Sequence, residues 1–121
     1  NQVNLTSSSE LKNIVDTIEI GHADWSSTTS AKDRAVIMVT AAQQMIIRRL
    51  EFAVIICKET NKTIDESLAD VDEAIDFLNF YAREEVNIVS AQSRCPFVVI
   101  APWNFPLAIP CGMVIGPLVA T

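Results

Sequence analysis

The charged residues of this chain are confined to one part of it. Every Asp, Glu, Lys and Arg lies between Glu10 and Arg94, and residues 95–121 carry none. An uncharged segment of that length has to be buried in protein or in lipid, whereas the region before it can form amphipathic helices that face water. At 121 residues we expect one domain or part of one, with a helical region over 1–94 and a second, buried region over 95–121.

The balance of charge excludes two classes of partner. Fifteen acidic residues against nine basic ones give a net charge of −6 and an isoelectric point near 4.6. Nucleic acids and anionic membrane surfaces are held by clustered Lys and Arg. We therefore expect neither as a partner.

The cysteines and the histidine favour a reducing compartment and no metal site. Cys57, Cys95 and Cys111 are odd in number and include no CxxC pair, which argues against a disulfide scaffold. His22 is the single histidine, so a zinc site of the Cys/His kind lacks ligands. The first residues contain no basic stretch followed by an apolar core, so no secretion signal is expected, and both ends look cut from a longer chain. The predicted location is the cytoplasm, or the mitochondrial matrix in a eukaryote.

The first predicted helix covers residues 7–20. Its apolar residues recur at helical spacing, Ser7 and Glu10 fit a capping box, and Gly21 suits a helix stop. The Ser- and Thr-rich segment 24–30 is predicted to be a loop.

Two further helices are predicted before the uncharged segment. Residues 31–59 have the pattern of one long helix capped by Ser30, although the β-branched run 52–57 also permits a strand. Residues 64–86 form a third helix with one apolar face. Its acidic residues are assigned to the opposite face, as a solvated surface rather than a divalent-cation site: Asp65, Glu66, Asp70, Asp72, Glu73 and Asp76.

The uncharged segment predicts a strand, a turn and a helix. Residues 97–101 form an apolar run between two prolines, which is typical of a short strand buried in a parallel sheet. A helix is expected next, with Pro106 in its first turn and with Gly112 and Gly116 permitting close packing. A membrane span is the alternative, but five prolines would leave carbonyls without donors in lipid. We therefore expect an α/β fold and no membrane.

Asn104 is the strongest candidate for chemistry. It follows the predicted strand in the run Ala-Pro-Trp-Asn-Phe-Pro, between two prolines that each fix φ. Ligands of open α/β sheets bind at that edge, where an Asn amide can donate to a developing oxyanion. The alternative is that Asn104 only caps the next helix and Trp103 only fills the core. Cys95 and Cys111 have no base or cation nearby in sequence, so we expect buried thiols rather than nucleophiles.

The same residues resemble a known family. The stretch from Phe97 to Met113, with Pro-Trp-Asn-Phe-Pro at its centre, is similar to the strand–turn–helix of NAD(P)-dependent aldehyde dehydrogenases. The stretch Ala69–Arg83 resembles a helix of the Δ1-pyrroline-5-carboxylate (L-glutamate γ-semialdehyde) dehydrogenase branch. The resemblance covers roughly residues 10–121. It implies that the helices lead into the first strand–turn–helix of an incomplete Rossmann-like cofactor domain, which would begin at residue 95.

The resemblance also implies roles for individual residues. Asn104 would donate to the thiohemiacetal oxyanion, Phe105 would line the aldehyde tunnel, and Glu73 would lie at the substrate entrance. The backbone of Ile100, Ala101, Pro102 and Trp103 would line the cofactor, NAD or NADP. The full-length protein would be a homo-oligomer that oxidises a small aldehyde in proline catabolism. No metal is implied.

Two hypotheses of different class follow. The first is a part of an aldehyde dehydrogenase that is inactive alone, because the catalytic Cys and Glu of the family lie downstream and Cys111 does not stand at the nucleophile's motif position. The second is a non-catalytic acidic helical module with a structural or interaction role.

Overall fold

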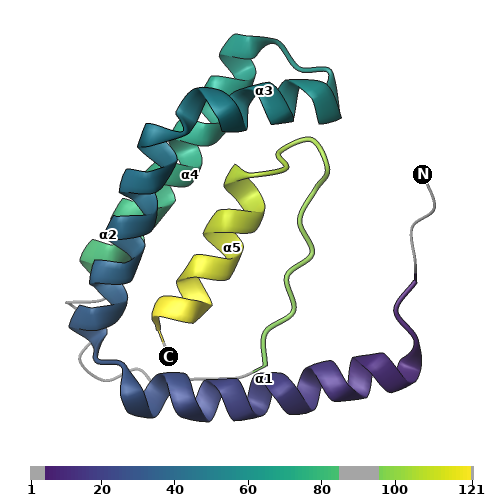
Figure 1. Cartoon of the computed structure of the whole chain (residues 1–121), viewed down its shortest axis with the longest axis vertical. Coiled ribbons are helices and arrows are strands. Elements are labelled where there is room, and N and C mark those ends of the chain that lie inside the picture. The colour runs from purple at the N-terminus through teal and green to yellow at the C-terminus, as the bar shows by residue number, and fades with distance from the viewer. Residues whose placement is uncertain (1–4, 85–95, 121) are drawn as a thin grey trace.

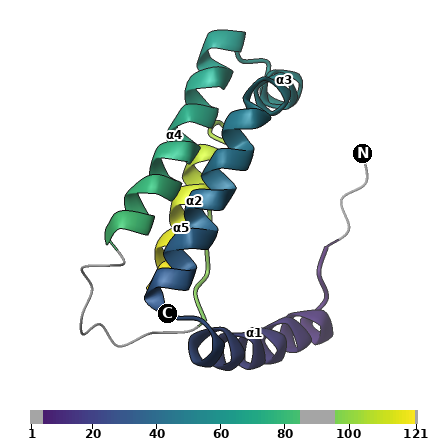
Figure 2. The same ribbon diagram turned by 60° about the vertical axis from the view of Figure 1, so that its left-hand side comes forward.

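The computed structural model describes residues 5–84 and 96–120, and the regular elements among them are all helices (Figure 1). α4 contacts α2, α3 and α5, so it is the central helix, and α2, α4 and α5 lie side by side (Figure 2). No helix in these two stretches has both the length and the apolarity needed to cross a bilayer. The bounds are α1 Ser8–Thr28, α2 Ala31–Ile47, α3 Arg49–Thr60, α4 Ile64–Glu84 and α5 Ala108–Val119.

The core lies where the apolar face of α4 meets its three neighbours. Val71 and Ala74 are fully buried, and Leu78 continues the same face one turn further on. This face confirms the apolar stripe predicted for residues 64–86, of which 85 and 86 lie outside the described residues. The other helices contribute these buried residues: Met38, Ala42, Ala53, Ile56, Ala108, Ile115 and Val119.

α1 begins as predicted but ends later. Ser7 and Glu10 form the predicted capping box. Gly21 does not stop the helix, because glycine in a helix costs only about 1 kcal/mol. Of the loop predicted over 24–30, residues 24–28 are helical and only 29 and 30 lie outside a helix. α1 buries none of its residues, and only its C-terminal end, at Trp25, reaches another helix. The apolar stripe predicted for it is therefore largely exposed in the described residues.

The predicted helix 31–59 is two helices. Ser30 caps α2 as predicted, with Asp33 completing a capping box. The break falls at Arg48, whose φ of −103° and ψ of 16° leave the helical region. The redirected chain packs α3 against α4, where Ala53 and Ile56 are buried. The run 52–57 is helical, not a strand.

The prediction of an α/β fold with a Rossmann-like strand–turn–helix is wrong. Residues 97–101 are extended but form no strand, and Ile100 is 83% exposed rather than buried. A strand needs a neighbour to pair its N–H and C=O groups, and none of the described residues supplies one. The predicted division at residue 95 falls in 85–95, outside the described residues. α5, beyond that division, packs on α4.

Trp25 and Arg34 hold the C-terminal end of α5. The indole Nε1 of Trp25 donates to the Leu118 carbonyl at 3.0 Å, and Nε of Arg34 donates to the Val119 carbonyl at 2.9 Å. A cation there complements the helix dipole and satisfies carbonyls that have no intrahelical partner. These two contacts tie the C-terminal end of α5 to the end of α1, which contains Trp25, and to the start of α2, which contains Arg34.

The glycines of α5 allow the close packing that was predicted. A Cβ added at Gly112 would lie 2.9 Å from the Phe77 ring, and one at Gly116 would lie 3.3 Å from the Tyr81 ring. We expect Gly112→Val to lower the free energy of unfolding by about 1–3 kcal/mol, because the ring or the helix has to shift. Gly21→Ala is the control: its site in α1 is open, so it should stabilise the protein by about 0.5–1 kcal/mol. Urea unfolding of both variants checks this, and an unchanged midpoint for Gly112→Val would contradict the packing.

Candidate functional site

The turn before α5 contains Asn104, the residue predicted to take part in the chemistry, and this turn is exposed. Trp103 is 79% exposed, and Asn104 beside it is also exposed. The cap position of α5 is Leu107, so Asn104 does not cap the helix and Trp103 does not fill the core. None of the described residues forms a hydrogen bond with the Asn104 side chain. The alternative, a capping Asn104 and a core-filling Trp103, is therefore wrong, and the function of the turn stays a prediction.

A carboxylate from α4 caps α5 in place of a residue of its own turn. Asp70 is 1% exposed, and its Oδ1 accepts a hydrogen bond of 2.7 Å from the Ala108 backbone N–H. A negative charge at that position satisfies an unpaired donor and complements the helix dipole. The assignment of Asp70 to the solvated face is wrong. Helical spacing could have indicated the burial of Asp70, because it lies four residues before Ala74 and eight before Leu78, on the buried face.

Lys62 joins Asp70 to the turn. Its ammonium lies 3.1 Å from Oδ2 of Asp70 and 4.0 Å from the centre of the Phe105 ring, a cation–π distance. Lys62 reaches this position because Asn61 ends α3 in the left-handed conformation, with φ of 57°, which asparagine tolerates better than most residues. The link from the α3–α4 connection to the turn was not foreseen from the sequence.

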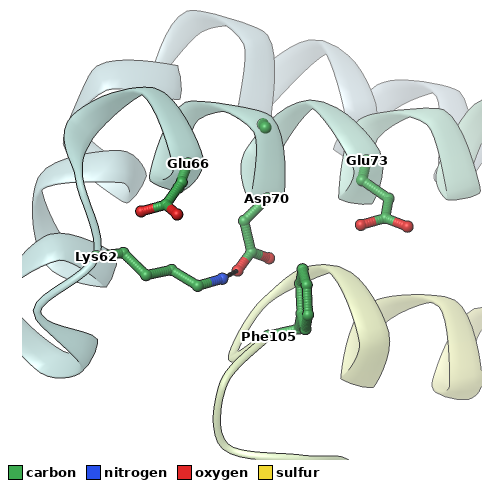
Figure 3. Close-up of a pocket in the computed structure, with 6 residues that line it drawn as sticks. Lys62, Glu66, Asp70, Glu73 and Phe105 are labelled. Carbon is green, nitrogen blue, oxygen red and sulfur yellow. Dashed lines mark hydrogen bonds and ion pairs between the residues drawn. The ribbon is translucent and has the colours of Figure 1, made fainter.

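The structure brings Phe105 and Glu73 to one pocket. The pocket has a volume of about 200 Å³ and opens between α4 and the turn before α5 (Figure 3). Glu73 is exposed at one side, and Lys62 lies at the other. The two residues expected to contact substrate thus line the same space. The full lining is Lys62, Glu66, Ala69, Asp70, Glu73 and Phe105.

Three carboxylates and one ammonium line the pocket, and two of those carboxylates, Glu66 and Asp70, are held by hydrogen bonds. The Thr63 backbone N–H and hydroxyl both donate to Glu66, and these bonds hold the pKa of that carboxyl below its usual value. Glu66 is therefore ionised and tied to the start of α4. Of the carboxylates lining the pocket, Asp70 is buried and paired with Lys62, and Glu73 is exposed.

Residues 100–103 form one continuous stretch beside the turn. Ile100 and Trp103 expose most of their apolar surface, and Pro102 is also exposed. Within the described ranges, no three His, Cys, Asp or Glu side chains are placed to hold a metal ion.

Cys111 lies in α5 and packs partly buried against the core. Its thiol is 3.9 Å from the Ala74 carbonyl, and burial raises its pKa to about 11. This environment suits an inert thiol, as predicted, because the thiolate is the nucleophilic form. Cys95 lies outside the described residues.

Comparison with known proteins identifies the family. The model for the aldehyde dehydrogenase family matches residues 1–121, and the chain belongs to that family. It is 38% identical over 110 residues to a 1-pyrroline-5-carboxylate dehydrogenase of a Geobacillus strain, covering 78% of this chain and 21% of that protein. It is 36% identical over 106 residues to 1-pyrroline-5-carboxylate dehydrogenase 2 of Bacillus subtilis, covering 75% and 21%. It is also 36% identical over 95 residues to the bifunctional protein PutA of Salmonella typhimurium, covering 76% and 7%.

The matched relatives are much longer than this chain. The chain spans about a fifth of the length of the dehydrogenases that it matches. No solved structure gives a significant match.

Proposed function

We propose that this chain supplies the oxyanion donor and the substrate entrance of an NAD(P)-dependent aldehyde dehydrogenase that oxidises L-glutamate γ-semialdehyde to glutamate. Membership of the family supports the reaction class. The names of the relatives, 1-pyrroline-5-carboxylate dehydrogenases, support the substrate. The observation that carries the proposal is an exposed Asn104 in a turn whose helix is capped by another residue.

Asn104 acts on the carbonyl oxygen of the aldehyde. When a thiolate adds to the carbonyl carbon, the C=O bond becomes a C–O⁻ bond and negative charge collects on oxygen. A fixed amide N–H aimed at that oxygen stabilises the charge. Pro102 and Pro106 restrict the backbone on both sides of Asn104, which reduces the freedom that would otherwise be lost on binding. In this proposal the thiolate comes from a part of the enzyme beyond these 121 residues.

When bound, the cofactor would supply the acceptor for the hydride that leaves the same carbon. Ile100, Ala101, Pro102 and Trp103 would line it, since they form an accessible stretch next to Asn104. NAD is the expected form, with NADP as the alternative. The contribution of this chain would be to hold the cofactor along residues 100–103, next to Asn104.

The pocket supplies the entrance for the substrate. Phe105 gives an apolar wall, and Glu73 carries a negative charge that suits the α-amino group of the semialdehyde. We expect the full-length enzyme to be a homo-oligomer. The absence of a disulfide pattern in the sequence supports a cytoplasmic location, or the mitochondrial matrix in a eukaryote.

An assay of the full-length protein tests the proposal. Glutamate semialdehyde with NAD is expected to yield NADH, and the rate with NADP identifies the preferred cofactor. Propionaldehyde, which lacks the amino and carboxylate groups, is expected to react more slowly and serves as the control. A folded protein that oxidises neither aldehyde with either cofactor would favour the non-catalytic acidic helical module.

A further inference from the structure

We propose that Asp70 and Lys62 are positioning residues that set the direction of the Asn104 amide. The proposal rests on the function proposed for Asn104 and extends it to two residues that touch neither the aldehyde nor the cofactor. They act on the turn that carries the donor.

Asp70 fixes the point where the turn becomes a helix. Its carboxylate is fully buried, and one oxygen accepts the Ala108 N–H while the other faces the Lys62 ammonium. Ala108 is the first residue of α5 and lies four residues after Asn104. The hydrogen bond therefore sets both the start of the helix and the exit of the turn.

Lys62 fixes the residue next to the donor. Its ammonium lies over the Phe105 ring and is only 17% exposed, so the contact is shielded from water. Figure 3 shows Lys62 and Asp70 on one side of the Phe105 ring. The turn is thus held at Phe105 and at Ala108, on the C-terminal side of Asn104, while Pro102 restricts the backbone on the other side.

The buried ion pair between Asp70 and Lys62 is better explained by the orientation it gives to the turn than by a gain in folding stability. Burying two charges costs desolvation energy that the attraction between them often only balances, and apolar residues of similar volume commonly do as well. Apolar contacts, however, do not fix the orientation of the groups that make them. A carboxylate with one donor on each oxygen has a single favourable orientation, and a displacement of about 1 Å at an active site can cost on the order of a hundredfold in rate.

The test is a double-mutant cycle in the full-length protein. Asp70→Asn keeps an oxygen for the Ala108 N–H but removes the charge that faces Lys62. We expect it to lower kcat by roughly tenfold to a hundredfold at saturating NAD, with the KM for NAD unchanged. In an Asn104→Ala background the same change should cost less than about twofold, because its effect passes through Asn104. Asp76→Asn, the same substitution at an exposed position of α4, is the matched control and should leave kcat unchanged.

The outcomes separate this inference from the proposed function. An equal loss of kcat in both backgrounds would show a merely structural role and overturn the inference alone, as would no loss in either. An unchanged kcat for Asn104→Ala would overturn the proposed role of the donor and the inference with it.

A second variant and a second readout cover the case in which Asp70→Asn does not fold. Lys62→Met keeps the hydrocarbon stem beside Phe105 and removes the ammonium, so the same cycle and the same expected losses apply to it. Hydrogen exchange of the peptide covering 103–112 should be faster in the variant than in the parent protein. Unchanged exchange there would contradict the claim that the pair holds the turn.

Discussion

Replacing Asn104 by alanine is expected to lower kcat of the full-length protein by about 10²–10³-fold, the loss typical of removing one oxyanion donor. The KM for the aldehyde should change much less, because the amide is needed most when charge develops on the oxygen. The variant should fold normally, since Asn104 is exposed and no described residue bonds its side chain. Steady-state kinetics with glutamate semialdehyde measures both parameters.

A control separates loss of the donor from loss of structure. Asn13→Ala makes the same change at an exposed position of α1, far along the chain from the turn, and should leave kcat as it is. An Asn104→Ala variant with unchanged turnover would rule out the proposed role. So would a loss of activity accompanied by an equal loss of folded protein.

Cys111 is expected to react with iodoacetamide about a hundredfold more slowly at pH 8 than an ordinary thiol. Burial raises its pKa from 9.0 to about 11, so the reactive thiolate is scarcer by roughly that factor. The rate should rise tenfold with each pH unit until the pH nears 11, provided that the protein stays folded. Alkylation followed by mass spectrometry of the peptide that contains Cys111 gives this rate.

The urea-unfolded protein is the internal reference for this experiment. Unfolding removes the burial, so the pKa should return toward 9.0 and alkylation at pH 8 should accelerate about a hundredfold. Alkylation of Cys111 in the folded protein at the unfolded rate would contradict its buried environment. It would also reopen the possibility that Cys111 is a nucleophile.

Local signals in the sequence predicted the helices better than their ends. The apolar face of α4, the capping box at Ser7 and the cap at Ser30 follow from short-range spacing, and the structure confirms them. The break at Arg48 has no glycine or proline to mark it, because it is set by how α3 packs on α4. Gly21 gave the opposite error: it was predicted to end the helix, but a glycine in an exposed helix is tolerated and α1 continues past it.

The candidate site was predicted in part. The Pro-Trp-Asn-Phe-Pro motif indicated the turn, and the structure leaves Asn104 exposed there, although its function stays a prediction. The strand at 97–101 was wrong because a buried strand depends on partners that local sequence does not reveal. Asp70 was missed because acidic residues were assigned to water as a class, whereas its position on the helix placed it in the core.

The central claim is that the turn between Pro102 and Pro106 aims an amide at the reacting oxygen. A crystal structure of the full-length protein with L-glutamate, the product of the proposed reaction, tests it most directly. The account predicts the Asn104 amide nitrogen about 2.7–3.1 Å from an oxygen of the newly formed carboxylate. A product carboxylate bound by other groups, with the Asn104 amide directed away from it, would contradict the account.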